Sequence, residues 1–267
     1  MKIGFFDSGL GGLTILRAVV TELPQYEYVF YGDTAHVPYG DREEDEVYQL
    51  TEAGVNALFA EDCTLVIIAC NTASAETVRR LQDTLLPQKY PDRRILGVIV
   101  PTVEEVIASG SQHTLLLATK RTVASGKYER EFAVREASCE LTSVTTPSLV
   151  GLIEQWHIEQ AVLDAKSAIE HTLQSSPDID SCVLGCTHYT VLKQLLRKEF
   201  PDVRFLTQDE IIPTKLVTYL RGHPEISNRL HTTGGQDIIL SDTSVFYNEV
   251  ASEFLKGIGD EFFTATK

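Results

Sequence analysis

Two cysteines occupy matching positions in the two halves of the chain. The apolar residues 65–69 lead directly into Cys70, and residues 183–185 lead into Cys186. Each run is typical of a buried strand, and a helical pattern follows each cysteine. A cysteine at that point lies at the carboxyl end of a strand, where open α/β sheets bind ligands. A helix amino terminus also favours the thiolate, so the two thiols could act as paired acid and base groups facing one substrate.

Three further cysteines lack that position. Cys63 lies before a predicted strand, Cys139 at the start of one and Cys182 inside one. Free cysteine is among the most buried residue types, so inert packing is expected for all three. Zinc bound by Cys182, Cys186 and His188 is an alternative, but the sequence has no Cys-x2-Cys pair of the usual zinc spacing. We therefore expect no metal.

His188 lies two residues after Cys186 and has two interpretations. It could be a structural histidine, or it could tune or shuttle a proton beside the thiol. The pair would also suit nucleophilic catalysis in a hydrolase or transferase. That interpretation leaves Cys70 without a role, so it ranks second to a pair of acid–base thiols. A binding protein on the same fold is a third class.

A glycine-rich segment, residues 7–12, joins the first predicted strand to the first predicted helix. Its glycines would let backbone N–H groups approach a ligand closely, and Asp7 and Ser8 precede them. The segment imitates a dinucleotide-binding turn, with Asp33 as the later acidic residue, but the third glycine of that fingerprint is missing. A tight turn without a ligand is the simplest alternative.

A second loop, residues 31–40, follows the second predicted strand and belongs to the same sheet edge. Its Pro38-Tyr39-Gly40 run is typical of a turn. The Tyr39 hydroxyl and the backbone N–H groups of the loop could also hold a carboxylate. Further along the chain, Glu154 is by default a solvated helix residue.

The elements that must position these residues alternate between strand and helix. Strands are predicted at residues 2–6, 27–31, 64–69, 95–100, 114–118, 141–144, 181–184 and 203–206. Helices are predicted at 11–23, 41–60 with Asp41 as its cap, 72–86, from 118 through 132, 148–155, 158–173 and 191–200, with one more in the tail near 243–255. This order predicts an α/β fold of two doubly wound, flavodoxin-like domains with mostly parallel sheets. We predict residues 1–94 plus 208–267 for the first domain and 95–207 for the second.

The composition fits a globular enzyme. The chain has 267 residues, 43% of them hydrophobic and 23% charged, close to the averages for folded domains. Its formal net charge of −15 argues against a nucleic-acid-binding surface, although a local basic pocket is compatible with it. We expect neither a signal peptide nor a membrane span. The odd number of cysteines, five, favours reduced thiols and a cytoplasmic location.

Taken together, these segments resemble the aspartate/glutamate racemase family, in particular its glutamate racemases. The resemblance covers most of the chain and rests on residues 7–12, 32–40, 69–73, 119–123, 146–154 and 184–189. The chain departs from the family pattern at His36, Thr146, Gly151 and Thr190, which leaves the paired cysteines unaffected.

The resemblance implies a cofactor-independent racemase that interconverts L- and D-glutamate, with its site between the two domains. The catalytic residues would be Cys70, Cys186, Asp7 and His188. The substrate contacts would be Asp7, Ser8, Tyr39, Gly40, Asn71, Thr72, Thr119, Thr122, Thr187 and His188, with Asp33 and Glu154 as supporting acids. It further implies a homodimer that supplies D-glutamate for peptidoglycan synthesis, while aspartate is the alternative substrate.

Racemisation removes the Cα proton from one face of an amino acid and returns a proton to the other. Two groups on opposite faces, one a thiolate and one a thiol, meet this requirement. General acid–base catalysis works best with a pKa near the working pH, and a cysteine pKa of ~8.5 can be lowered by a helix terminus. Donors at Ser8, Asn71, Thr72 and Thr187 would stabilise the charge that develops on the substrate.

Overall fold

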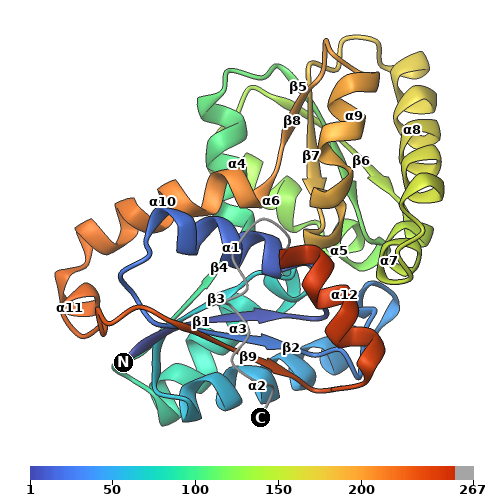
Figure 1. Ribbon diagram of the computed structural model, residues 1–267. Helices are drawn as coiled ribbons and strands as arrows, with labels where there is room; N and C mark the ends of the chain where they lie inside the picture. The colour runs from blue at the N-terminus through green and yellow to red at the C-terminus, as the bar shows by residue number, and fades with distance from the viewer. Residues whose placement is uncertain (256–267) are drawn as a thin grey trace.

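Two parallel β-sheets, each covered by helices, make up the chain (Figure 1). The computed structural model describes residues 1–255, without the side chains of residues 245, 246, 248 and 255. The two-domain α/β fold predicted from the sequence is confirmed. The domain boundaries remain predictions, and residues 256–267 of the predicted first domain lie outside the described residues.

The first sheet has the strand order β4-β3-β1-β2-β9, and all neighbours are parallel. Its strands are β1 (Lys2–Asp7), β2 (Tyr28–Gly32), β3 (Cys63–Ile68), β4 (Arg94–Gly97) and β9 (Gln236–Leu240). The central strands β1 and β3 are buried almost throughout, as expected for a sheet covered on both faces. The last strand, β9, returns from the end of the chain to pair with β2.

The second sheet has the order β6-β5-β7-β8 and is also parallel. Its strands are β5 (His113–Ala118), β6 (Glu140–Thr145), β7 (Ser181–Gly185) and β8 (Arg204–Leu206). One hydrophobic core continues from the first sheet to the second and includes Leu13 of α1 as well as Leu117 and Tyr189. The two sheets are therefore packed together through shared apolar side chains.

The helices fill the connections between strands. They are α1 (Leu13–Glu22), α2 (Glu44–Ala60), α3 (Asn71–Lys89), α4 (Ile99–Ala108), α5 (Lys120–Ala124), α6 (Lys127–Val134), α7 (Pro147–Glu154), α8 (Ile158–Ser175), α9 (Lys193–Glu199), α10 (Gln208–Gly222), α11 (Pro224–Ser227) and α12 (Val245–Leu255), with 3-10 turns η1 (Tyr39–Asp41) and η2 (Thr187–Leu192). Within residues 1–255, no helix combines the length and the apolar character that crossing a membrane requires.

Several predicted boundaries are wrong for local reasons. Asp41 ends the η1 turn, and α2 begins three residues later at Glu44, so Asp41 does not cap it. The strand predicted at 95–100 ends at Gly97, and Pro101 lies in the first turn of α4, where proline needs no backbone N–H partner. Gly126, at φ +59°, divides the helix predicted through residue 132 into α5 and α6.

The tail holds more structure than the single predicted helix. The long helix α10 packs against α1 and α4, and it is followed by α11 and β9 before α12 begins. Helix α10 was not predicted, because Pro213 interrupts its pattern. Strand β9, a short strand at the edge of the first sheet, was not predicted either.

Candidate active site

The end of strand β1 brings Asp7 to the edge where the two sheets meet. The Asp7 carboxylate is fully buried and accepts hydrogen bonds from the Gly9 N–H at 3.2 Å and from the Thr187 hydroxyl at 3.2 Å. Burial raises the pKa of Asp7, although the nearby His188 and the hydrogen bonds oppose that shift. The contact with Thr187 joins the carboxyl end of β1 to the turn that follows β7.

The glycines of this loop let it approach the second sheet closely. A Cβ atom on Gly11 would lie 2.5 Å from the backbone nitrogen of His188, and one on Gly9 would lie 2.7 Å from Oε1 of Glu154. Side chains larger than hydrogen at these positions would force the two sheets apart. The close approach of the protein's own backbone and side chains therefore accounts for the glycine run, without a nucleotide.

Cys70 lies where predicted, between β3 and α3. Its sulfur is 3.2 Å from the Ser8 hydroxyl and accepts a weak hydrogen bond from the Ala73 N–H at 3.5 Å. From the sequence, the helix terminus was expected to lower the pKa of this thiol. Instead, burial raises it to about 12, with a further contribution from Asp7, and the donors at Ala73 and Ser8 oppose this only partly. Desolvation therefore outweighs the helix terminus at Cys70.

Cys186 also follows its strand, but the next element is the 3-10 turn η2, and α9 begins only at Lys193. The predicted α-helix amino terminus at this thiol is therefore wrong. The group beside this thiol is instead His188, whose Nδ1 lies 3.8 Å from the Cys186 sulfur.

His188 is held on its other side by Glu154. Nε2 of His188 is hydrogen-bonded to Oε1 of Glu154, the last residue of α7. The default expectation of a solvated Glu154 is wrong, because this side chain is only 7% exposed. Burial alone would lower the pKa of His188, but the Glu154 carboxylate and the contact with Cys186 raise it well above the usual value. The imidazole is therefore held protonated between a carboxylate and a thiol.

A cluster of threonine hydroxyls connects α3 of the first domain with α5 of the second. The Thr72 hydroxyl of α3 lies 2.9 Å from that of Thr119 and 3.2 Å from that of Thr122. Thr119 follows β5 and caps α5 by accepting from the Thr122 N–H. Gly40 allows the Tyr39 loop to approach this cluster, because a Cβ atom there would lie 2.8 Å from Cβ of Thr119.

Asn71 presents an unused donor in the same region. Its Oδ1 accepts from the Tyr128 hydroxyl at 2.8 Å and from Nε2 of Gln208 at 3.3 Å, whereas its buried Nδ2 has no partner in the described structure. The sequence analysis missed Tyr128 and Gln208. The two residues come from different helices, and neither belongs to a sequence motif. Only their contacts with Asn71 in the folded protein identify them.

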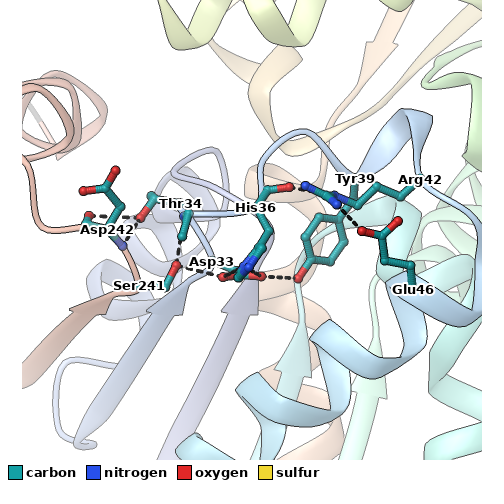
Figure 2. Close-up of polar contacts among 9 residues, drawn as sticks. Asp33, Thr34, His36, Tyr39, Arg42, Glu46, Ser241 and Asp242 are labelled. Atoms are coloured by element: carbon teal, nitrogen blue, oxygen red, sulfur yellow. Dashed lines mark hydrogen bonds and ion pairs between the residues drawn. The ribbon is translucent and has the colours of Figure 1, made fainter.

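The second predicted loop is organised around Asp33, as Figure 2 shows. Its carboxylate accepts from the Tyr39 hydroxyl at 2.6 Å, from Nδ1 of His36 at 2.8 Å and from the Ser241 hydroxyl at 2.7 Å. The Tyr39 hydroxyl thus binds a carboxylate within the protein, and burial together with this bond raises its pKa. Arg42 and Glu46 form an ion pair at the outer end of the loop. Ser241 is a contact that the sequence analysis did not consider.

The remaining cysteines carry no comparable surroundings. Cys63 and Cys182 are fully buried, and burial raises their pKa values. Cys139 is only partly buried, but it packs against the hydrophobic core of the second sheet. Among the described residues, the cluster that could hold a metal ion is His113 with Glu140 and Asp178, at the opposite end of the second sheet, rather than the cysteines.

The site is closed in this structure. Cys70 and Cys186 are 5% and 7% exposed, so the protein covers both side chains almost completely. A cavity of about 710 Å³ lies elsewhere, between α3, α4 and α10, and contains none of the predicted site residues.

Comparison with known proteins agrees with this arrangement. Residues 13–212 match the family model described as Asp/Glu/Hydantoin racemase. The chain is 37% identical over 263 residues to the glutamate racemase of Paracoccus denitrificans, covering 92% of this chain and 96% of that protein.

Solved structures give the same result. The glutamate racemase isoform RacE1 of Bacillus anthracis superimposes with a TM-score of 0.85 at 25% identity, covering 95% of this chain and 93% of the other. The Escherichia coli glutamate racemase, solved with L-glutamate and an activator, has a TM-score of 0.70 at 25% identity and covers 95% of this chain and 92% of the other. The predicted resemblance is confirmed: the chain belongs to the Asp/Glu/Hydantoin racemase family and is an amino-acid racemase.

Proposed function

We propose that the protein interconverts L- and D-glutamate by a two-thiol mechanism that needs no cofactor. The substrate class comes from the similar proteins, which are named glutamate racemases and one of which was solved with L-glutamate. The observation that best supports the mechanism is that Cys70 and Cys186 follow strands of different sheets, β3 and β7, and that a hydrogen bond from Thr187 to Asp7, at the end of the neighbouring strand β1, joins these sheet edges. One thiol can thus face each side of a substrate bound between them.

Starting from D-glutamate, the Cys70 thiolate takes the Cα proton, and the electron pair of the broken C–H bond remains on the substrate as a carbanion. The Cys186 thiol then donates its proton to the opposite face and becomes a thiolate. The product is L-glutamate, and the reverse reaction begins at Cys186. Each turnover moves one proton onto one sulfur and one proton off the other, so atoms and charges balance.

On the Cys70 side, the substrate must help to form the thiolate, because burial and Asp7 hold the thiol pKa at about 12. The α-ammonium group of the amino acid brings a positive charge to this side and would offset both the Asp7 carboxylate and the thiolate. Thiolate formation is then coupled to substrate binding. That coupling keeps a reactive sulfur protonated while the site is empty.

On the Cys186 side, the protein supplies the positive charge itself. The His188 imidazolium, held by Glu154, lies 3.8 Å from the sulfur and stabilises the thiolate. Glu154 keeps His188 charged and fixes its ring, so we assign it a positioning role. The two thiols are therefore activated by different groups, which makes their contributions separable by mutation.

Donors close to the two thiols would stabilise the carboxylate groups of the substrate and the carbanion. The unpartnered Nδ2 of Asn71 is one, and hydroxyls at Ser8, Thr72, Thr119, Thr122 and Thr187 are others. Such preorganised donors act strongly in a site from which water is excluded. Tyr39 and Gly40 complete the proposed substrate-binding set.

The direct test incubates the purified protein with L-glutamate in deuterium oxide, without added cofactor. We expect D-glutamate to form with deuterium at Cα, and L-aspartate to react much more slowly. Racemisation of aspartate instead of glutamate would refute the substrate assignment. Formation of D-glutamate without Cα exchange would refute the mechanism.

A Cys–His hydrolase or transferase is the second candidate, supported by the 3.8 Å contact between Cys186 and His188. It predicts a covalent intermediate on Cys186 and no role for Cys70. Retention of activity in a Cys70→Ser variant would favour it. In the cell, we propose that the enzyme acts as a cytoplasmic homodimer and supplies D-glutamate for peptidoglycan.

A further inference from the structure

One segment near the end of the chain touches both sides of the proposed site. We propose that Ser241–Phe254, the segment that leaves β9 and forms most of α12, holds the substrate loop at one end and His188 at the other. Ser241 and Phe254 are then positioning residues for the reaction. This inference rests on the proposed function, because it assigns different roles in racemisation to the two ends of the segment.

The first end fixes the loop that carries Tyr39. The Ser241 hydroxyl donates to Oδ1 of Asp33 at 2.7 Å and accepts from the Ala35 N–H at 2.9 Å, as Figure 2 shows for Asp33. Asp33 also accepts the hydrogen bond of the Tyr39 hydroxyl, so the Asp33 carboxylate links the Ser241 side chain to that of Tyr39.

Two more hydrogen bonds connect the loop to the segment. The Thr34 hydroxyl donates to the Asp242 carbonyl at 3.0 Å and accepts from the Asp242 N–H at 2.9 Å (Figure 2). The loop is therefore tied to the segment by both backbone and side chains. Its position depends on the segment as well as on β2.

The second end packs behind the acid–base group of the other sheet. The Phe254 side chain is 1% exposed, and its ring meets that of His188 nearly perpendicularly at a centroid distance of 6.1 Å. Trp156 packs against the same phenyl ring at 5.5 Å. Trp156 has a φ of +59°, a strained conformation for a large residue, directly after α7 and two residues beyond Glu154.

The backbone at Phe254 is anchored to the first domain. Its carbonyl accepts a hydrogen bond from Nη1 of Arg17 at 3.2 Å, and α12 packs along α1. Figure 1 shows α12 beside α1 at the junction of the two sheets. Phe254 thus keeps water from one side of the buried His188–Glu154 pair while being attached to the opposite domain.

The two ends should give different kinetic signatures. Ser241→Ala loosens the loop that contacts substrate, so we expect KM for glutamate to rise about tenfold, the equivalent of ~1.4 kcal/mol, with a smaller change in kcat. Phe254→Ala admits water beside His188, so we expect kcat to fall about tenfold. In that variant, the isotope effect with Cα-deuterated L-glutamate should increase, because proton removal by Cys186 becomes slower relative to other steps.

Matched controls separate these effects from general destabilisation. Ser143→Ala removes another serine-to-carboxylate bond of 2.7 Å, to Glu129, and Phe205→Ala empties another buried position, 2% exposed, in β8. Both controls should lower thermal stability without changing KM or the isotope effects. The conservative variants Ser241→Thr and Phe254→Tyr should restore much of the lost function.

The outcome that overturns the inference is an active wild-type enzyme in which Ser241→Ala and Phe254→Ala behave like their controls. Equal changes of KM and isotope effect in both variants would also overturn it, because the two ends would then have no separate roles. If the wild-type enzyme itself fails to exchange the Cα proton of glutamate, the proposed function fails instead. The wild-type assay therefore distinguishes the two failures.

Discussion

Glu154→Gln tests whether the His188–Glu154 pair activates only one of the two thiols. The substitution keeps the size of the side chain and its ability to hydrogen-bond to His188, but removes the negative charge. Burial then dominates the pKa of His188 and lowers it, since the Glu154 carboxylate is the main group that raises it. The ring then loses its proton more readily and stabilises the Cys186 thiolate less.

The structure sets the size of the effect. At the 3.8 Å separation of Nδ1 and the sulfur, two opposite charges attract by about 4 kcal/mol with an effective dielectric constant of ~20. Loss of that attraction corresponds to a decrease in kcat/KM of roughly 10³-fold at most. The enantiomers have equal free energies, so kcat/KM must fall equally in both directions. The asymmetry appears in the isotope effects.

The assay compares Cα-deuterated L- and D-glutamate. In Glu154→Gln, proton removal from L-glutamate by Cys186 becomes rate-limiting, so the primary isotope effect should rise for that enantiomer. For D-glutamate the slow step becomes reprotonation from Cys186, so its primary isotope effect should fall while the solvent isotope effect rises. Glu199→Gln, which breaks an exposed ion pair with Lys166, is the control and should change neither value.

The pH dependence of stability gives a second measurement. The pKa of His188 in the folded wild type is raised above the unfolded value of ~6.5, so its stabilising contribution is complete below that pH and is lost as the pH rises through the folded pKa. In the Glu154→Gln variant, the stability of the fold should no longer decrease as the pH rises through the range in which wild-type His188 loses its proton. If the isotope effects change equally for both enantiomers and the stability profile is unaltered, the pair only positions the substrate and the reasoning is refuted.

Four further predictions follow from the same geometry. Cys70→Ser and Cys186→Ser should each reduce racemisation at least ~10³-fold in both directions, because the serine hydroxyl is far less acidic than a thiol. Activity near the wild-type level in either variant would disprove the two-thiol mechanism. Asp7→Asn should raise the melting temperature above pH ~4, since burial raises the pKa of this carboxyl and its ionised form is unfavourable in the fold; an unchanged or lower melting temperature would contradict this. Saturating D-glutamate should protect Cys70 and Cys186 together from alkylation, and protection of only one would show that they do not share a closed site. Gly11→Ala, with its Cβ 2.5 Å from the His188 nitrogen, should reduce activity and lower stability by about 2 kcal/mol or more. Gly151→Ala lies inside α7 and meets no atom within 4 Å, so it should leave activity unchanged and raise stability by about 0.5–1 kcal/mol.

Local patterns in the sequence determined most of the strands and the chemistry at their ends. The alternation of apolar runs with helical periodicity predicted the two parallel sheets, because buried parallel strands are continuously apolar. The placement of Cys70 and Cys186 directly after such runs put both at carboxyl ends, as the structure shows. These features depend on neighbouring residues only, so the sequence alone could predict them.

The tertiary structure decided which groups surround each thiol. Glu154 looked like a solvated helix residue, and only the packing of α7 against η2 brings it to His188. The pKa of Cys70 was expected to fall, but the amount of protein that covers the sulfur raises it, and burial cannot be read from the local sequence. Ser241 and Phe254 reach the site from the far end of the chain, where no motif marks them. Contacts between residues distant in sequence depend on how the two sheets and the returning tail pack, and that packing exists only in the folded chain.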